Sequence, residues 1–134
     1  MKKENSYYVY FSIKGDFDVE KVKNDLNLPV FRMWKDSELR RDGHPYGFSH
    51  LAICKVEEYD PYVTNNLEKI VDLLINKKEY LNKLRESSHV EYSLIVVPHI
   101  VVNTVYPSLS PSLKVMDFCS ETRTKLDIDL YLYK

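Results

Sequence analysis

The stretch Leu126-Asp127-Ile128-Asp129-Leu130-Tyr131-Leu132-Tyr133 alternates between aliphatic residues and residues that are acidic or aromatic. Successive side chains of a β-strand point to opposite faces of its sheet. The four aliphatic residues are therefore expected to face a core. Asp127, Asp129, Tyr131 and Tyr133 are expected on the other face. The pattern predicts a last strand in a sheet that has one buried face and one open face.

A predicted first strand over residues 7–14 divides in the same way. Its inward set is apolar, and its outward set begins with two tyrosines, Tyr8 and Tyr10. Two strands far apart in the chain thus predict the same division between a buried face and an open face.

Three helices and three further strands are predicted between these two strands. Asp18 is a good N-cap, because its carboxylate can accept the free amide protons of a first helical turn. Asp60-Pro61 and Ser110-Pro111 place a capping residue before a proline that fits the first turn. The predicted helices cover residues 18–27, 60–86 and 110–122, the strands cover 30–35, 48–56 and 90–101, and loops cover 36–47 and 102–109. The stripe of the longest helix is interrupted at Lys77 and Lys78.

The predicted order β-α-β-β-α-β-α-β indicates an α+β fold in one domain, residues 1–134. Its first six elements are those of a ferredoxin-like split β-α-β unit, with a mainly antiparallel sheet and an added C-terminal helix and strand. A doubly wound parallel sheet is the alternative, and it would require strands that are apolar at every position. Residues 90–101 partly fit that requirement, whereas the first and last strands do not. In residues 48–56 both alternating sets of side chains are largely apolar, so the sequence does not show which set faces the core.

Composition excludes several classes of function. The net charge is −1, from 19 basic and 20 acidic residues, which is not typical of a nucleic-acid-binding protein. No apolar run approaches the length of a membrane span, and no apolar stretch follows Lys2 and Lys3 as it would in a secretory signal. Cys54 and Cys119 are expected to be reduced and to pack as small hydrophobic residues, which indicates a cytoplasmic protein.

The chain carries no recognisable catalytic, phosphate-binding or metal-binding motif. The four histidines are too widely spaced to predict a zinc site, so no metal and no cofactor is expected. Asp127 and Asp129, two apart on one strand face, have a separation that carboxylate pairs use in glycoside hydrolysis. Exposed acids lack the raised pKa of a proton donor, so solubility or partner binding is the preferred role for them.

Two groups of residues are candidate binding sites. The first is the outward face of the first and last strands, where tyrosines and acids gather and where a protein partner or a second copy is expected to bind. It consists of Tyr8, Tyr10, Asp127, Asp129, Tyr131 and Tyr133. The second belongs to the long connection around residues 36–46, a place where loops often carry function. It consists of Trp34, Arg40, Arg41, His44 and Tyr46.

Four segments resemble an uncharacterised bacterial family, domain of unknown function 4279. They are the first strand with Gly15-Asp16-Phe17-Asp18, Leu28-Pro29 with Trp34-Lys35, Pro45-Tyr46-Gly47-Phe48-Ser49, and Leu126-Asp127-Ile128-Asp129-Leu130-Tyr131. The chain departs from the family pattern at residues 36–41, where a glycine is common. The resemblance implies no activity and no catalytic residue.

The sequence favours a non-enzymatic protein-interaction module of bacterial type. An immunity or antidote protein that blocks the basic site of a toxin with its tyrosines and acids is one form that this function could take. The alternative is a small-molecule sensor or an enzyme, with a pocket between the sheet and the loop at residues 36–46.

Overall fold

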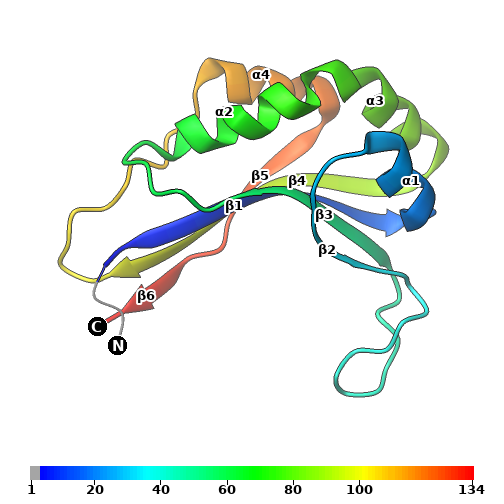
Figure 1. Cartoon of the computed structure of the whole chain (residues 1–134), viewed down its shortest axis with the longest axis horizontal. Coiled ribbons are helices and arrows are strands. Elements are labelled where there is room, and N and C mark those ends of the chain that lie inside the picture. The colour runs from blue at the N-terminus through cyan, green and yellow to red at the C-terminus, as the bar shows by residue number, and fades with distance from the viewer. Residues whose placement is uncertain (1–3) are drawn as a thin grey trace.

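Strand β1 (Ser6–Asp16) is the central strand of a mixed sheet in the computed structural model, which describes residues 4–134 (Figure 1). It pairs antiparallel with β3 (Ser49–Val56) on one side and with β4 (His89–Val101) on the other. Strand β2 (Val30–Trp34) pairs antiparallel with β3 and forms one edge. Strands β5 (Thr124–Ile128) and β6 (Tyr131–Tyr133) both run parallel to β4 and form the other edge. The strand order is β2-β3-β1-β4-β5.

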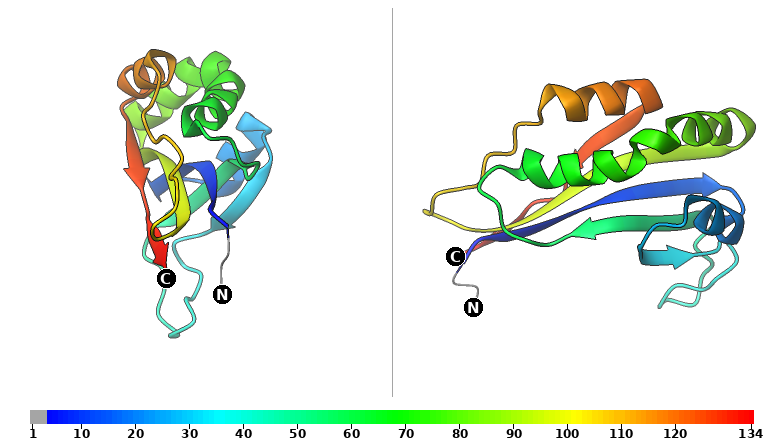
Figure 2. Two further views of the ribbon diagram at one scale, coloured as in Figure 1. Left: turned by 90° about the vertical axis from the view of Figure 1, so that its left-hand side faces the viewer. Right: turned by 45° about the horizontal axis from the view of Figure 1, so that its top comes forward.

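All the described helices lie on one side of this sheet (Figures 1 and 2). They are α1 (Val19–Leu26), α2 (Val63–Leu74), the 3-10 helix η1 (Ile75–Lys77), α3 (Lys78–Ser87) and α4 (Leu113–Thr122). The predicted α+β class with a helical layer on a single face is therefore confirmed, and the parallel alternative with two covered faces is excluded.

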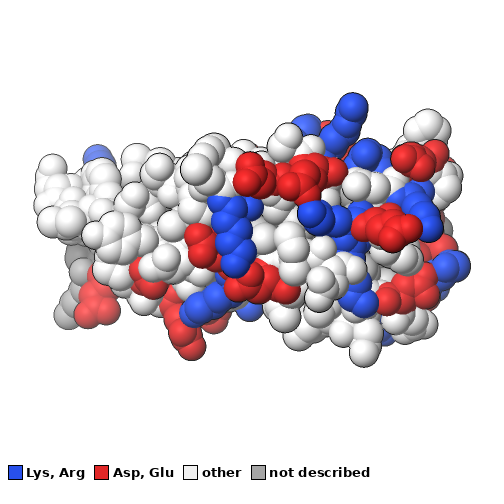
Figure 3. All heavy atoms as spheres, turned by 90° about the horizontal axis from the view of Figure 1, so that it is seen from above, with Lys and Arg blue, Asp and Glu red and all other residues white. Residues whose placement is uncertain are grey.

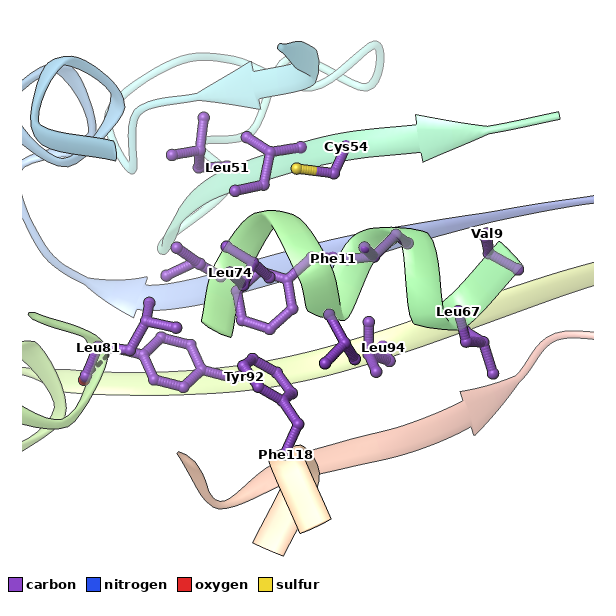
Figure 4. Close-up of a cluster of buried hydrophobic side chains, with 14 of the residues drawn as sticks. Val9, Phe11, Leu51, Cys54, Leu67, Leu74, Leu81, Tyr92, Leu94 and Phe118 are labelled. Atoms are coloured by element: carbon purple, nitrogen blue, oxygen red, sulfur yellow. Dashed lines mark hydrogen bonds between the residues drawn. The ribbon is translucent and has the colours of Figure 1, made fainter. Parts of the chain in front are cut away.

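The main core lies between the helices and the sheet. Alternate residues of β1 enter it, and Val9, Phe11 and Ile13 are fully buried. Figure 4 shows Phe11 beside Leu74 of α2, with Tyr92 and Leu94 of β4 and Phe118 of α4 around it. Each helix places an apolar stripe on the same sheet face, so one continuous core holds the domain together.

The predicted long helix at residues 60–86 is wrong in its continuity and its start. Helix α2 begins after Tyr62, and the helical run is divided by η1, which contains Lys77. Lys77 and Lys78 interrupt the row of buried apolar residues. After the 3-10 turn, burial begins again on α3 with Leu81. The Asp60 carboxylate caps no helix. It accepts a hydrogen bond of 2.8 Å from the backbone N–H of Tyr62 and so shapes the preceding turn.

Helix α4 begins after Ser112 rather than at Ser110, because the Ser112 hydroxyl accepts from the N–H of Val115. Strand β1 likewise continues past its predicted end at residue 14, through Gly15 and Asp16. A methyl group on Gly15 would lie 1.9 Å from the carbonyl oxygen of His89, so only glycine permits this approach of β1 to β4.

The predicted last strand is split into β5 and β6. Pro98 of β4 lies between the segments that pair with them, and it has no N–H to donate to the ladder. The pairing register is the same before and after the break, since Val96 is opposite Ile128 and His99 is opposite Tyr131. The alternation of faces therefore survives the interruption.

The expectation that all four aliphatic residues of this strand face a core is wrong. Leu126 is half-buried against the main core, whereas Ile128, Leu130 and Leu132 are 44%, 51% and 60% exposed. They lie on the correct face, but β6 runs past the end of the helical layer (Figure 1). No helix is there to cover them.

The Tyr7 hydroxyl ties the segment before α2 to the central strand. It donates to the carbonyl oxygen of Asp60 at 2.7 Å and accepts from the Asp60 N–H at 3.1 Å. It also accepts from the side-chain amide of Asn66 at 3.0 Å, and both side chains are at least 98% buried. The three bonds satisfy polar groups that would otherwise be buried without partners.

Replacing Tyr7 with phenylalanine should therefore lower the free energy of unfolding by about 2 kcal/mol, because buried polar groups lose their partner. Urea denaturation measures this change. Tyr106→Phe is the matched control, since Tyr106 is 56% exposed. Equal stabilities of the two variants would contradict the assigned role of the Tyr7 hydroxyl.

Candidate functional site

The sheet face opposite the helices, called the open face below, carries a small hydrophobic cluster of its own. Tyr10, Ala52, Ile95 and Val97 form it from three neighbouring strands, and Tyr8 and Phe31 pack against it. Tyr10 is only 8% exposed. Tyr10 lies on the outward face, as predicted, but its ring is buried there as part of this second cluster.

A bulge in β3 shapes this face. Cys54 has a left-handed backbone (φ 62°), and the register between β1 and β3 shifts by one residue there. Ile53 and Cys54 consequently both contact the main core, and Lys55 returns to the open face. Side chains of β3 are buried on both faces of the sheet, which explains why its sequence did not indicate one buried side.

Aromatic side chains continue from the small cluster to the β6 edge. Tyr8 stacks on Tyr10 with ring centres 6.0 Å apart, and both contact Phe31. His99 lies 6.2 Å from Tyr8 and stacks on Tyr131 at 5.0 Å, and its Nδ1 is 2.7 Å from the Tyr133 hydroxyl. We call this set the aromatic strip; it consists of Tyr8, Tyr10, Phe31, His99, Tyr131 and Tyr133. The tyrosines of the first and last strands thus lie on one side of one sheet, as their alternation predicted.

Charged groups of opposite sign lie at the two ends of the aromatic strip. The Lys55 ammonium is 4.3 Å from the Phe31 ring centre and 4.7 Å from that of Tyr8, and the Arg32 guanidinium is 4.8 Å from Phe31. Asp127 and Asp129 lie at the β5 edge, where both are exposed. The strip therefore has Lys55 and Arg32 at its β2–β3 end, where Glu57 pairs with Lys55 at 2.5 Å, and the two acids at the end of β5.

This charge distribution acts on the tyrosines. Burial is the main cause that raises the pKa of Tyr10; Arg32 opposes the rise, and Asp127 and Asp129 add to it. The negative charge of Asp129 is the main cause that raises the pKa of Tyr131. Both phenols stay protonated near neutral pH and can donate hydrogen bonds to a partner.

The second predicted group, around the loop at residues 36–46, separates into two parts in the structure. Trp34 and Tyr46 stack with ring centres 4.1 Å apart, and the indole N–H of Trp34 donates to the carbonyl oxygen of Phe48. Figure 1 shows the loop between β2 and β3 extending away on the open side of the sheet. These two aromatic rings fasten the base of that loop.

Arg40, Arg41 and His44 lie instead in the exposed part of the loop. The Arg40 guanidinium pairs with Asp42 at 3.0 Å, and the Arg40 N–H donates to the carbonyl oxygen of His44. Their contacts are internal to the turn, so the structure does not join them to Trp34 and Tyr46 in one site.

A buried polar pair, missed by sequence reasoning, lies under the Trp34 ring. Ser12 Oγ and His50 Nε2 are 3.1 Å apart, and Trp34 covers the imidazole at 4.3 Å between ring centres. His50 is 2% exposed. Burial is the main cause that lowers the pKa of His50 to about 4, and the charges of Lys14 and Arg32 lower it further. The imidazole is neutral at physiological pH.

His50 should make stability depend on pH. The unfolded chain binds a proton at this residue below about pH 6.5, whereas the folded protein binds it only below about pH 4. Between these values the unfolded state holds more protons, so the free energy of unfolding falls as pH falls, by about 2 kcal/mol from pH 7 to about pH 4.5. Urea denaturation at the two pH values should show a smaller fall for His50→Gln. An equal fall in both proteins would contradict this assignment.

A hollow of about 600 Å³ adjoins this region. Lys14, Gly15, Phe48, His89, Val90 and Glu91 line it. Trp34 packs on both Tyr46 and His50 beside it, and the residues that line the hollow do not include the predicted Trp34, Tyr46 and His50.

Residues 4–134 contain neither a cluster of metal ligands nor a disulfide. No group of three or more His, Cys, Asp or Glu side chains in that part could hold a metal ion. Cys54 is buried, Cys119 is half-buried, and neither forms a disulfide. None of the helices in residues 4–134 has the length and apolar character needed to cross a membrane.

Several residues of the open face could not be found from sequence. Phe31, Lys55 and His99 join the aromatic strip only because the register of β2, β3 and β4 places them beside Tyr8. The run from Leu94 to Val101 is apolar on both faces apart from His99, so alternation did not show the side to which His99 points. The bulge at Cys54 hid the position of Lys55.

Fold and site together define an α+β protein with a one-sided sheet and an aromatic open face. A family model described as "Domain of unknown function (DUF4279)" matches residues 5–133. The chain belongs to this family, as its four sequence segments suggested. Neither the curated proteins nor the solved structures that were searched contain a match.

Proposed function

We propose that this protein is a non-enzymatic interaction module that binds a protein partner through its open face. The observation that supports this most is the aromatic strip on a sheet face that no described helix covers (Figure 2). Tyr131 is 46% exposed although it stacks on a histidine, so its ring presents apolar surface to the solvent. Soluble proteins commonly use such patches for binding.

The chemistry of the strip favours a protein over other partners. Tyrosine, phenylalanine and arginine are enriched in protein interfaces and supply many of their strongest contacts. RNA-binding sheets also display aromatic residues, but Asp127 and Asp129 would repel phosphates there. The partner surface is expected to place a basic group against this acidic end and an acidic group against Arg32, since Lys55 already pairs with Glu57.

Catalysis finds little support in the geometry. His50 is the buried imidazole on this face, and Trp34 and Ser12 cover the ring that a substrate would have to reach. Asp127 and Asp129 are exposed, without the apolar surroundings that would make a carboxyl group a proton donor.

An immunity or antidote protein of a bacterial toxin is the form of this function that we favour. Acids and tyrosines suit the basic surface of a toxin active site, and charge complementarity accelerates such association. Free cysteines support a reducing compartment such as the cytoplasm. The order β2-β3-β1-β4 with antiparallel neighbours supports the related proposal that the first six elements are a ferredoxin-like unit.

Capture from cells that naturally express the protein tests this function. A tagged protein should retain a stoichiometric partner, and the double variant Tyr8→Ser/Tyr131→Ser should lose it. Interface aromatics of this kind are worth about 2 kcal/mol each, so the pair should weaken binding by at least 100-fold. Tyr10 is left intact because it is part of the second cluster.

The control is Tyr106→Ser, which removes an exposed tyrosine outside the open face and should retain the partner. Circular dichroism verifies that each variant is folded. Retention of every captured protein by the folded double variant would refute binding through this face.

A small-molecule site is the second candidate, and the hollow at the end of β1 and β4 supports it. Phe48 offers a ring to stack on, while Lys14, His89 and Glu91 offer charged or polar contacts. Its volume of about 600 Å³ is within the range of metabolite pockets.

Thermal unfolding in the presence of a metabolite library distinguishes this candidate. A ligand at 100 times its Kd should stabilise the protein by about 2.7 kcal/mol and raise its Tm by several degrees. Phe48→Ala should abolish the rise while Phe31→Ala leaves it in place. A library without any such ligand would remove this candidate.

A further inference from the structure

We propose that two copies of this chain associate by antiparallel pairing of their β5–β6 edges. This inference goes beyond the proposed function, because it concerns the free edge of the sheet, where Tyr131 and Tyr133 are the members of the aromatic strip that take part. It rests on the free hydrogen-bonding groups of that edge, on its exposed aliphatic side chains, and on the self-complementary sequence of residues 127–133.

The outer edge presents unpaired backbone groups at alternate residues. The Asp129 N–H donates to Val96 of β4 at 2.8 Å, and the Tyr133 carbonyl oxygen accepts from Val102 at 2.8 Å. Odd-numbered residues thus direct their backbone groups toward β4. Because these groups alternate along a strand, Ile128, Leu130 and Leu132 direct theirs outward. Edges of this kind are templates for another strand.

Both edge strands are short, and β5 and β6 are separated by a break at residues 129–130, but the two edges differ in their basic residues. Strand β2 is a five-residue strand whose pairing shifts between Val30 and Arg32, and Arg32 places a charge there. Irregularity and basic residues are the usual protection of an edge strand. Between Leu126 and Tyr133 there is no lysine, arginine or proline.

Exposed apolar surface accompanies the free edge. Ile128, Leu130 and Leu132 are about half exposed on the helical side of the sheet. Leu130 and Leu132 also border an almost wholly apolar hollow of about 90 Å³ beneath Tyr106 and Pro107. Figure 3 shows that the end of the molecule carrying the loop between β4 and α4 has few charged groups, unlike the rest of that face.

The sequence of the edge matches itself in one antiparallel register. If the two-fold axis passes beside Leu130, that residue faces its own copy, and Ile128 faces Leu132 of the other copy on the helical side. On the open face, Asp129 faces Tyr131 and Asp127 faces Tyr133. Each acid meets a phenol that can donate a hydrogen bond, and no two acids oppose each other. A two-fold interface requires this reciprocity.

The backbone agrees with this register. Strand alternation directs the N–H and C=O groups of Ile128 and Leu132 outward, as a hydrogen-bonded pair of an antiparallel ladder requires, and Leu130 lies between them at the break between β5 and β6. The dimer would contain one continuous sheet with helices on one side and two aromatic strips on the other.

Sedimentation analysis of the whole chain tests the association. The native protein at high micromolar concentration should have twice the 15.9-kDa mass of one chain. Leu130→Lys should be a monomer, because two ammonium groups would meet at the axis. Leu39→Lys, at a residue 64% exposed in the distant loop, should remain a dimer. A monomeric native protein, or a dimer that Leu130→Lys leaves intact, would overturn the proposal.

Cysteine crosslinking tests the register. In a Cys119→Ala background, Leu130→Cys should form an intermolecular disulfide on mild oxidation, because facing residues of a hydrogen-bonded pair have Cα atoms about 5.5 Å apart. Leu132→Cys should not, since its two copies would lie about 13 Å apart along the strands. Faster crosslinking at position 132 than at position 130 would refute this register. Tyr8→Ser should leave the dimer unchanged, which separates this test from that of partner binding.

Discussion

The position of β1 between β3 and β4 is the constraint on which the rest of this structure depends. The strand pairs with β4 along its whole length and with β3 from Val9 to Gly15, so its alternation of inward and outward residues is imposed on β4 and, up to the bulge at Cys54, on β3. A slip of one residue would move Phe11 out of the core and Tyr10 into it. Gly15 allows the end of β1 to pair closely with β4, and the Tyr7 hydroxyl fastens the segment that leads to α2. Both ends of the strand are thus held in one register.

The one-sided placement of the helices follows from this register and produces the open face. Apolar residues of β1, β3 and β4 fill the space under the helices, and a smaller set around Tyr10 makes a second cluster on the other side. That second cluster supports Tyr8 and Phe31 from below, so these rings are held in place before any partner arrives. A surface with fewer rotamers to immobilise loses less entropy when it binds. Tyr10 lies within the second cluster and contributes to stability, whereas Tyr131 is exposed at the rim and is available for contact.

Much of this arrangement could be predicted from period-two alternation alone. The faces of residues 7–13 and 126–133 were assigned correctly, because hydrophobic periodicity directly reports the side on which a strand is buried. The joint position of Tyr8 and Tyr131 followed from these assignments. Burial of the aliphatic residues near Leu130 was predicted wrongly, because the pattern reports the face of a residue but not whether a helix reaches it.

Other features depend on contacts that no local pattern records. The break between β5 and β6 is caused by Pro98 on the neighbouring strand, and the bulge at Cys54 appears only in the pairing of β1 with β3. His50 and Ser12 are 38 residues apart in the chain and meet through the same pairing. Register between strands is a tertiary property, so residues such as Phe31, Lys55 and His99 could be assigned to the aromatic strip only from the structure.

Hydroxyl-radical footprinting of the protein, alone and in complex with its captured partner, tests most directly whether the open face is the binding surface. Mass spectrometry would report the modification of each aromatic side chain in both states. If the open face binds the partner, Tyr8, His99 and Tyr131 become protected in the complex, while Tyr62, which is 61% exposed at the start of α2, reacts as before. Protection of Tyr62 and the exposed residues of α2 and α4, with Tyr8 and Tyr131 unchanged, would contradict binding through this face.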